Sequence, residues 1–226
     1  MNQDNVYLDI EADNFFHRNK YNFDNIPEKK QVLIDQFANY VDNIKINNIL
    51  EIGCHIGDLL NYSVDKFSAK KGYGIEPSVK AVQEGNKRFG KNCQLVKGIA
   101  SNNHIFKKIP VCDLVIINDV FCWISRDSIF RSIANIDEHI GDNGYLIIRD
   151  FLPKRFIRNQ NMHVENFEVF CHKIIGSHAE IFKQIGNYQL LGSRVFTDVS
   201  LTLSTTQQYG DTENRWVDII LQKRWE

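Results

Sequence analysis

Hydrophobic residues in this chain gather in short continuous runs, separated by longer segments in which they recur every three or four positions. The run CDLVIIND at 112–119 is nearly continuous hydrophobe, as expected for a parallel strand covered on both faces. Similar runs predict four more strands, at 48–52, 73–77, 94–97 and 145–149. Strands that alternate with helices imply a parallel sheet with right-handed crossovers.

Amphipathic periodicity predicts the helices between these strands. Pro27 suits the first turn of a helix whose apolar stripe continues to Ile44. Further helices are expected over 59–67, 78–89 and 126–140, because apolar positions repeat there at helical spacing.

The last part of the chain departs from this alternation. After a helix around 177–184 come two strand-like runs, 188–196 and 216–222, with a polar loop between them. A flavodoxin-like or dehydrogenase sheet predicts continued alternation of strand and helix instead. We divide the chain into a lead-in at 1–26 and a main domain at 27–226.

Composition places the chain among globular proteins. It has 226 residues, of which 43% are hydrophobic and 24% charged, which suffices for one well-packed domain with appendages. A net charge of −1 gives no global basic field to attract nucleic acid or anionic membranes. No apolar run is long enough for a membrane span, and the polar, acidic N-terminus is unlike a signal or transit peptide, so we expect a soluble, cytoplasmic protein. The five cysteines are never spaced as C-x-x-C, which indicates reduced thiols rather than a disulfide or zinc framework.

The most specific motif is ILEIGCHIGD, from Ile49 to Asp58. A strand runs into a tight turn bracketed by Gly53 and Gly57, and a helix opens at Asp58. Glycines at both places allow the backbone to approach a ligand closely. A dinucleotide fingerprint needs G-x-G-x-x-G, whose middle glycine lets the phosphates approach the helix N-terminus. That glycine is absent here, since His55 and its neighbours fill the turn.

This turn resembles motif I of the class I S-adenosylmethionine (SAM)-dependent methyltransferases, an acidic residue followed by G-x-G-x-G. His55 takes the place of the middle glycine, and histidine is among the few residue types that tolerate a positive φ. The resemblance implies SAM as cofactor and a Rossmann-like α/β fold. It also implies a seven-stranded, mostly parallel sheet with a C-terminal antiparallel hairpin and helices on both faces, and the two late strands fit that hairpin.

A second motif, YGIEP at 73–77, ends the next strand on Glu76. An acid at the tip of the second strand can accept hydrogen bonds from both ribose hydroxyls of an adenosine. Each motif alone is common in α/β proteins, where a strand-ending glutamate is often just solvated. Their order and their βαβ spacing together favour a cofactor site.

The resemblance assigns a set of residues to the cofactor. The backbone of 53–57 would carry the methionine half, Glu76 the ribose, and the loop at 98–101 the adenine edge. Asn118 lies at the end of the fourth strand, where open α/β sheets bind ligands. The expected cofactor-binding residues are Arg18, Glu51, Gly53, Cys54, His55, Gly57, Glu76, Pro77, Ala100, Ser101 and Asn118.

A narrower resemblance covers FFHRN at 15–19, the two motifs above, CDLVIINDVFCWI, GYLIIRDFLP and the closing RWVDIILQKR. These segments are similar to bacterial methyltransferases found with surface-glycan biosynthesis, including those associated with pseudaminic acid and other nucleotide-linked sugars. In such proteins the lead-in folds over the cofactor site, where Arg18 would bind the methionine carboxylate bidentately. The alternative is that Phe15 and Phe16 are packing residues and Arg18 is solvated. The segment 154–180 is expected to cover the acceptor.

Methyl transfer to a hydroxyl needs a base, and the candidates are Asp119, Asp150, His163 and His172. Asp150 ends the fifth strand and is expected to point into the same crevice as Asp119. The two histidines lie in the covering segment, where an imidazole can take a proton near neutral pH. Each candidate has an ordinary alternative, because a strand-end aspartate is often a cap or an ion-pair partner and a lone histidine is often a surface residue.

Two further groups of side chains are candidates for a metal site and for a stacking wall. His163, His172 and His178 fit no common zinc or facial-triad spacing, so no metal is expected. Phe121 and Trp123 either wall a sugar or adenine by stacking or pack in the core.

Three function classes remain. The leading one is a methyltransferase acting on an oxygen or nitrogen of a small molecule, such as a sugar or sugar-linked intermediate of surface-polysaccharide biosynthesis, with a homodimer left open. The others are an NAD(P)-dependent oxidoreductase and a SAM-binding, non-catalytic partner subunit. A nucleic-acid methyltransferase is disfavoured, because the chain is near neutral and NDVF at 118–121 differs from the N/D-P-P-Y/F signature of amino-methylating enzymes.

Overall fold

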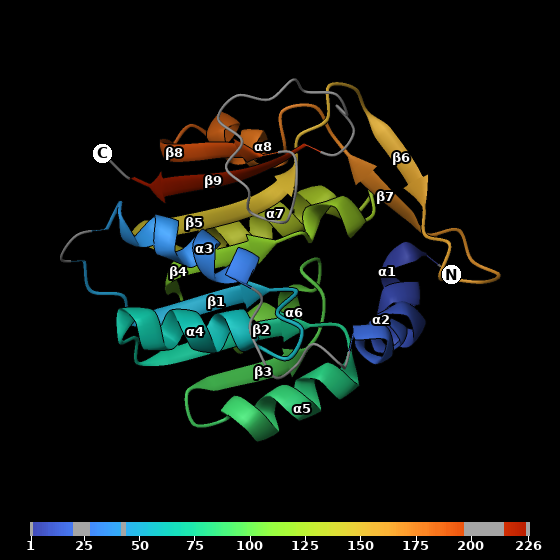
Figure 1. The fold of residues 1–226 in the computed structure, drawn as a ribbon, viewed down its shortest axis with the longest axis horizontal. Helices are drawn as coiled ribbons and strands as arrows, with labels where there is room; N and C mark the ends of the chain where they lie inside the picture. The colour runs from blue at the N-terminus through green and yellow to red at the C-terminus, as the bar shows by residue number, and fades with distance from the viewer. Residues whose placement is uncertain (1, 20–27, 42–43, 197–214, 225–226) are drawn as a thin grey trace.

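The computed structural model describes residues 2–19, 28–41, 44–196 and 215–224. Its centre is a seven-stranded sheet in the order β3-β2-β1-β4-β5-β9-β8 (Figure 1). The strands are β1 (Asn48–Ile52), β2 (Lys71–Glu76), β3 (Cys93–Lys97), β4 (Cys112–Asn118), β5 (Ile140–Phe151), β8 (Tyr188–Phe196) and β9 (Trp216–Lys223). Neighbours from β3 to β5 pair in parallel, whereas β9 pairs antiparallel with both β5 and β8. The expected mostly parallel sheet with a C-terminal antiparallel hairpin is confirmed.

Helices cover both faces of this sheet. They are α3 (Glu28–Ala38), α4 (Asp58–Phe67), α5 (Val79–Phe89), α6 (Asn103–Phe106), α7 (Ile129–Glu138) and α8 (Ala179–Ile185). Helices α3, α4 and α5 lie on one face and α6, α7 and α8 on the other (Figure 1). Leu114 and Ile116 of β4 pack in the core with α3 and α4, whereas Val115 and Ile117 pack in the core with α7 and α8. Successive residues of β4 therefore point into two hydrophobic cores, one on each face of the sheet. This explains why its apolar run is nearly continuous.

Two helices are shorter than their sequence patterns. Helix α3 stops at Ala38, so Tyr40 and Ile44, which are both exposed, lie outside the expected apolar stripe. Helix α7 ends before Ile140, which instead begins β5 and pairs with β4.

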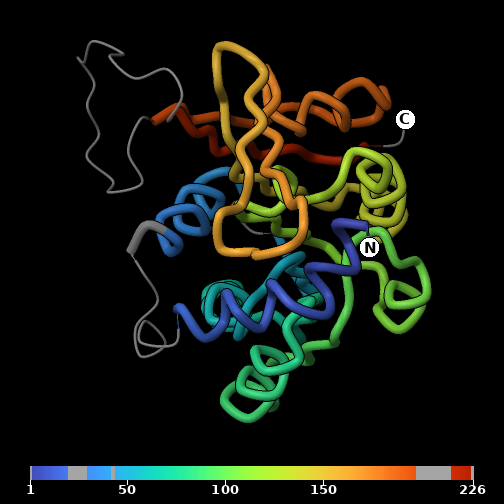
Figure 2. The backbone as a smooth tube through the Cα atoms, turned by 90° about the vertical axis from the view of Figure 1, so that its right-hand side faces the viewer, coloured from blue at the N-terminus to red at the C-terminus, as the bar shows by residue number. Residues whose placement is uncertain are grey.

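The start of the chain is helical, which its sequence pattern does not predict. It forms α1 (Gln3–Val6), the π-helix η1 (Tyr7–Glu11) and α2 (Ala12–Asn19). These helices lie at the side of the sheet toward which the parallel strands run (Figures 1 and 2). The remainder of the lead-in, from 20 to 26, lies outside the described residues.

A small hairpin projects at the same side of the molecule. Strand β6 (Ile157–Gln160) pairs antiparallel with β7 (Phe170–Lys173), and both belong to the segment 154–180 (Figure 2). Val6 of α1 packs with Val164 and Val169 of the hairpin loop in a third hydrophobic cluster. The start of the chain and the hairpin thus form one layer over the carboxyl ends of the parallel strands. Among the described residues, no helix combines the length and apolar character that crossing a membrane requires.

Candidate active site

A cavity of about 780 Å³ lies at the carboxyl ends of β1, β2 and β4. Its walls come from the turn after β1, the end of β2, the loop after β3, the end of β4, and the helices at the start of the chain. This is the position at which open α/β sheets bind ligands. Of the expected site residues, it is lined by Arg18, Glu51, Gly53, His55, Glu76, Pro77, Ala100, Ser101, Asn118, Asp119 and His163.

The turn after β1 uses three left-handed residues at alternate positions. Gly53, His55 and Gly57 have φ values of +69°, +52° and +78°. The amide of Gly53 donates to the carbonyl of Ile75 at 2.8 Å, which ties the turn to the end of β2. His55 therefore adopts the conformation that the motif requires of its middle glycine, as the tolerance of histidine for positive φ allows.

The two glycines of the turn make room for protein side chains. A Cβ added at Gly53 would lie 2.5 Å from Cγ2 of Val120, and one added at Gly57 would lie 3.2 Å from Cδ1 of Leu95. The structure thus adds a second reason for these glycines beside close approach to a ligand, because a side chain at either position would meet Val120 or Leu95. Val120 itself lines the cavity, so the fit at Gly53 still shapes the site.

Two backbone amides fix the carboxylate of Glu76 in the cavity wall. Its Oε1 accepts a hydrogen bond from the amide of Ser78 at 2.9 Å, and its Oε2 accepts one from the amide of His55 at 2.8 Å. Burial raises the pKa of Glu76 to about 7, against these two hydrogen bonds, which lower it. Each oxygen keeps a lone pair for a further donor, so a pair of adjacent hydroxyls matches this carboxylate.

Glu51 presents a second carboxylate, and one of its oxygens is unsatisfied. Among the described residues, no hydrogen-bond partner reaches Oε2 of Glu51, although the side chain is buried and lines the cavity. Burial raises the pKa of Glu51 well above its ordinary value. Lys30, which the sequence reasoning missed, also lines the cavity and lies 3.2 Å from both carboxylate oxygens of Asp58. A buried carboxylate oxygen without a donor is suited to a cationic ligand group.

The end of β4 contributes Asn118 and Asp119 to the cavity wall. Asp119 has a φ of +60°, and its amide donates to the carbonyl of Arg149 at 3.1 Å. The two aromatic residues that follow are separated by the structure. Phe121 is buried and stacks on His178 with ring centroids 5.4 Å apart, whereas Trp123 lines the cavity. The expectation of core packing is therefore confirmed for Phe121, whereas it is wrong for Trp123, which lines the cavity.

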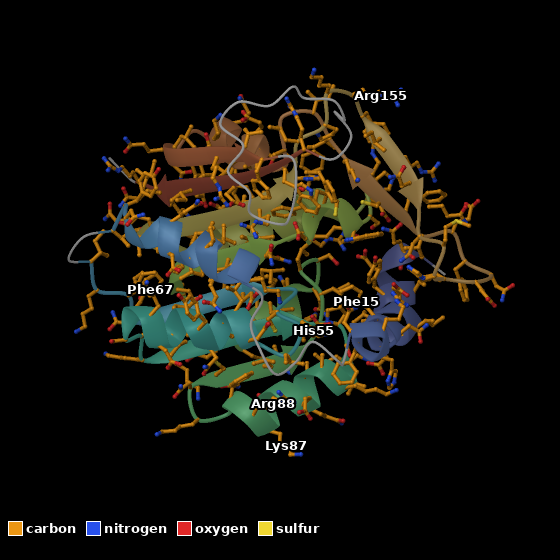
Figure 3. All side chains as sticks on the ribbon, in the orientation of Figure 1. Phe15, His55, Phe67, Lys87, Arg88 and Arg155 are labelled. Atoms are coloured by element: carbon orange, nitrogen blue, oxygen red, sulfur yellow. The ribbon has the colours of Figure 1, made fainter. Side chains whose placement is uncertain are left out.

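Arg18 forms an ion pair inside the protein. Its Nη2 lies 2.6 Å from Oε1 of the buried Glu11, and the same oxygen accepts a hydrogen bond from Asn161 at 3.0 Å. Phe15 packs edge-on against His55, with ring centroids 5.7 Å apart (Figure 3). The side chain at the middle position of the turn therefore contacts the helix that bears Arg18.

Asp150 does not line the cavity, and the expectation that it points into the crevice is wrong. Its Oδ2 accepts hydrogen bonds from the amide of His178 at 2.9 Å and from the hydroxyl of Ser177 at 3.2 Å, and it lies 2.7 Å from Nδ1 of His178. Successive side chains of a strand point to opposite faces, and the residue before it, Arg149, is the one that lines the cavity. Asp150 anchors the start of α8.

Replacing Asp150 with alanine should therefore reduce stability and spare cofactor binding. The substitution leaves buried partners of the carboxylate unpaired, which costs about 3 kcal/mol. We expect a melting temperature lower by roughly 6–12 °C, since about 1 kcal/mol shifts a domain of this size by about 2–4 °C. Affinity for S-adenosylhomocysteine (SAH) should stay within about twofold of wild type. An unchanged melting temperature with a large loss of turnover would instead support a catalytic Asp150.

Three other expected residues lie away from the cavity wall. Cys54 is buried with its sulfur toward β2, where a Cβ added at Gly74 would meet it, and its amide donates to the carbonyl of Ile75 at 3.3 Å. Gly57 is the N-cap residue of α4 and is not among the residues that line the cavity. His172 lines a different cavity. The contacts with a ligand that were expected for Cys54, Gly57 and His172 are not supported by this geometry.

Several lining residues carry no sequence signal. Tyr7, Glu11, Lys30, Ser132, Arg149 and Asn161 all line the cavity. Except for Arg149, which lies in GYLIIRDFLP, they belong to segments without a motif. Packing of the start of the chain, α3, α7, β5 and the hairpin brings them together. Only the charge of some of them could have been noticed beforehand.

Comparison with known proteins agrees with this architecture. Residues 50–146 match the family described as "Methyltransferase domain". No curated protein sequence matches the chain.

Solved structures share the fold at low sequence identity. The chain is similar to the 1,6-didemethyltoxoflavin-N1-methyltransferase of Burkholderia thailandensis, solved with 1,6-didemethyltoxoflavin and SAH, at 10% identity and a TM-score of 0.67, covering 97% of this chain and 88% of that one. It is also similar to the N-methyltransferase NodS of Bradyrhizobium japonicum in complex with SAH, at 12% identity and a TM-score of 0.62, covering 99% of both chains. A third is the glycopeptide N-methyltransferase MtfA with SAM, at 10% identity and a TM-score of 0.58, covering 85% of this chain and 92% of that one.

The match to the methyltransferase domain covers the turn after β1, the end of β2 and strand β4, which build most of the cavity. The solved structures extend the agreement in fold to nearly the whole chain. An oxidoreductase is set aside on this evidence. The chain therefore contains a methyltransferase domain at residues 50–146, and its fold is that of the class I SAM-dependent methyltransferases.

Proposed function

We propose that this enzyme, acting in the cytoplasm, methylates an oxygen or nitrogen of a small molecule, and that the acceptor is a sugar or sugar-linked intermediate of surface-glycan biosynthesis. The observation that carries the proposal is the single cavity that runs from Glu76 to Tyr7, Trp123 and His163. Its volume of about 780 Å³ lies within the range of small-molecule sites, and helices at the start of the chain contribute to its wall. A covered cavity suits a small acceptor better than a polymer.

The residues at one end of the cavity fit SAM. When bound, SAM supplies a methyl group already activated by its sulfonium. Glu76 would accept the two ribose hydroxyls, and Ala100 and Ser101 would face the adenine. Glu51 would pair with the methionine ammonium through its unsatisfied oxygen. Arg18, which keeps further donors beside Glu11, would bind the methionine carboxylate.

Another part of the cavity wall, next to the residues assigned to SAM, combines aromatic faces with polar groups. The rings of Tyr7 and Trp123 lie 6.2 Å apart between centroids, and both line the cavity with Asn161. Tyrosine and tryptophan offer an apolar face and a polar edge, which suits a sugar ring.

His163 is the base that this geometry favours. It lies in the hairpin segment, lines the cavity, and is exposed, and its amide donates to Oδ1 of Asn161 at 3.0 Å. No hydrogen bond to its ring nitrogens is present among the described residues, so the imidazole can receive a proton from an acceptor. Asp119, which also lines the cavity, is the alternative base.

Replacing His163 with alanine is expected to lower kcat about 100-fold, because a positioned base contributes at least that much to proton transfer. The KM for SAM should stay within about twofold, since the cofactor end is untouched. Steady-state kinetics with varied SAM measures both. The matched control is His104→Ala, which removes an exposed histidine outside the cavity. Equal kcat in the His163 variant and wild type would transfer the assignment to Asp119.

Cofactor affinity should depend on pH through Glu76. Only the ionised carboxylate accepts both ribose hydroxyls, and burial raises the pKa of Glu76 to about 7. SAH affinity should therefore be constant above about pH 7 and fall as the pH drops below it, approaching tenfold per pH unit. Calorimetry from about pH 5.5 to about pH 8.5 tests this, with Glu76→Gln as a control that cannot titrate. A flat wild-type profile would refute the role given to Glu76.

The acceptor class is tested by transfer of a labelled methyl group from SAM to a panel of nucleotide sugars, their free nucleotides and non-carbohydrate amines. We expect label on nucleotide sugars or on the sugars released from them. Label found on the free nucleotides or on the amines alone would refute a carbohydrate acceptor and leave the methyltransferase intact.

A further inference from the structure

A second cavity, of about 410 Å³, lies between the β6–β7 hairpin and the start of the chain. Arg126, Arg158 and His172 line it together with two phenylalanine rings, and among the described residues Glu168 is the one carboxylate on its wall. It is separate from the cofactor cavity, and nothing in the proposed methyl transfer uses these residues.

Helix α1 stands between the two cavities. Asp4 lines the cofactor cavity, and the residue before it, Gln3, lines the second one. Gln3 is fixed there, because its amide nitrogen donates to the carbonyls of Trp123 at 2.7 Å and Phe170 at 2.9 Å. Its amide oxygen accepts from the nitrogen of Phe170 at 2.9 Å. The second cavity therefore has a rigid wall of its own.

The two arginines are held by aromatic rings rather than by acids. The guanidinium carbon of Arg158 lies 3.4 Å from the ring centroid of Phe170, and that of Arg126 lies 5.6 Å from the ring centroid of Phe156. Among the described residues, neither arginine forms a hydrogen bond or an ion pair. These cation–π contacts use the faces of the guanidinium groups and leave their N–H donors at the edge, where they can meet an oxyanion bidentately.

His172 supplies a buried polar group at the same place. It is 8% exposed, and its Nδ1 has no hydrogen-bond partner among the described residues. Its ring lies nearly parallel to that of Phe156, with centroids 6.2 Å apart. Burial, followed by the charges of Arg158 and Arg126, lowers the pKa of His172, so the imidazole is neutral at neutral pH in the free protein. A buried ring nitrogen that no described residue pairs is costly unless a ligand completes it. The exposed guanidinium groups of Arg126 and Arg158 line the same cavity.

We propose that the cavity between β6–β7 and α1 is a binding site for a phosphate or diphosphate group, held by Arg126, Arg158 and His172. Two guanidinium charges match a dianion better than they match a single carboxylate, and the imidazole adds one more donor or acceptor. The volume of about 410 Å³ exceeds what one phosphate fills, which leaves room for the molecule that carries it. That molecule is either the methyl acceptor itself or a separate phosphorylated ligand.

The test is a calorimetric titration of the full chain with inorganic pyrophosphate at low ionic strength. We expect saturable binding to the wild type, at least about tenfold weaker binding to Arg126→Ala and to Arg158→Ala, and no detectable binding to the double variant. Arg131→Ala is the matched control, because Arg131 is exposed on α7 and lies outside the cavity. It should bind pyrophosphate within about twofold of wild type.

Two further titrations separate this inference from the methyltransferase assignment. SAH should bind wild type and all these variants equally, which shows that they are folded and that the cofactor site is independent. Three results would overturn the phosphate site even with SAH binding intact. Pyrophosphate fails to bind the wild type, it binds the double variant as tightly as the wild type, or malonate binds the wild type as tightly as pyrophosphate does.

The source of the phosphate is resolved once an acceptor is in hand. Pyrophosphate that competes with the acceptor in the methyl-transfer assay assigns the phosphate to the acceptor. Pyrophosphate that binds without competing assigns it to a separate ligand, and either result supports the site.

Discussion

Replacing Gly53 with valine is expected to weaken SAH binding by about 30- to 20,000-fold. Gly53 has a φ of +69°, which a β-branched residue adopts only at a cost of about 1–3 kcal/mol. A Cβ at this position would lie 2.5 Å from Cγ2 of Val120, and relieving that overlap costs about as much again. The turn must shift, and with it the His55 amide that holds Glu76. Calorimetric titration with SAH measures the loss.

A graded series separates backbone strain from the overlap. Gly53→Ala adds only the Cβ, and Gly53→Ala combined with Val120→Ala removes the atom that this Cβ would strike. The double variant should recover part of the affinity that Gly53→Ala loses, whereas Val120→Ala alone should bind SAH nearly as wild type does. Wild-type affinity in Gly53→Val would show that the turn is not part of the cofactor site.

The second large effect is expected at Glu76. Glu76→Ala removes two charge-assisted hydrogen bonds to the ribose, each contributing about 1.5–3 kcal/mol, so SAH affinity should fall by about 100- to 10,000-fold. The loss should appear in SAH titration and in the KM for SAM. It follows from the position of the carboxylate, which two backbone amides fix at the cavity wall.

Glu84→Ala is the matched control for Glu76→Ala. It removes the same charge from the same region, on helix α5, but Glu84 is paired with Arg88 and lies outside the cavity. SAH affinity in this control should stay within about twofold of wild type. Equal losses in both variants would mean that Glu76 acts through general electrostatics rather than by contact.

The sheet and the turn after β1 are predictable because their signals are local. Apolar runs mark strands that are buried on both faces, and the bounds of β1 and β8 agree with their sequence patterns. The turn needs positive φ at alternate positions, and glycine and histidine are residue types that permit it. Glu76 follows from its place at the end of the second strand, which a parallel sheet brings to the same edge.

The covering layer is not predictable in this way, because its contacts are distant in sequence. Asp4 accepts hydrogen bonds from three serines, Ser101 at 2.8 Å, Ser125 at 3.0 Å and Ser128 at 2.6 Å. These partners lie about a hundred residues away in the sequence. In addition, η1 has π-helical spacing, so its apolar residues do not recur at the α-helical period. Strand β6 is mostly exposed, so it shows no alternation of apolar and polar residues.

Asp150 shows the same limit within the sheet. A carboxylate at the end of a strand either faces the crevice or caps a neighbouring helix, and the strand pattern alone does not distinguish the two. His178, which follows 28 residues later, determines the orientation of Asp150, because both its amide and its ring contact the carboxylate.

Titration of the wild-type protein with SAH, alongside NAD and NADP, tests the central assignment most directly. We propose that the carboxylate of Glu76 binds the ribose and that Glu51, whose Oε2 has no hydrogen-bond partner among the described residues, binds the ammonium. The turn after β1 lacks the glycine that a dinucleotide pyrophosphate requires. We expect micromolar binding of SAH and no binding of either dinucleotide. Binding of NAD or NADP without SAH would contradict the account.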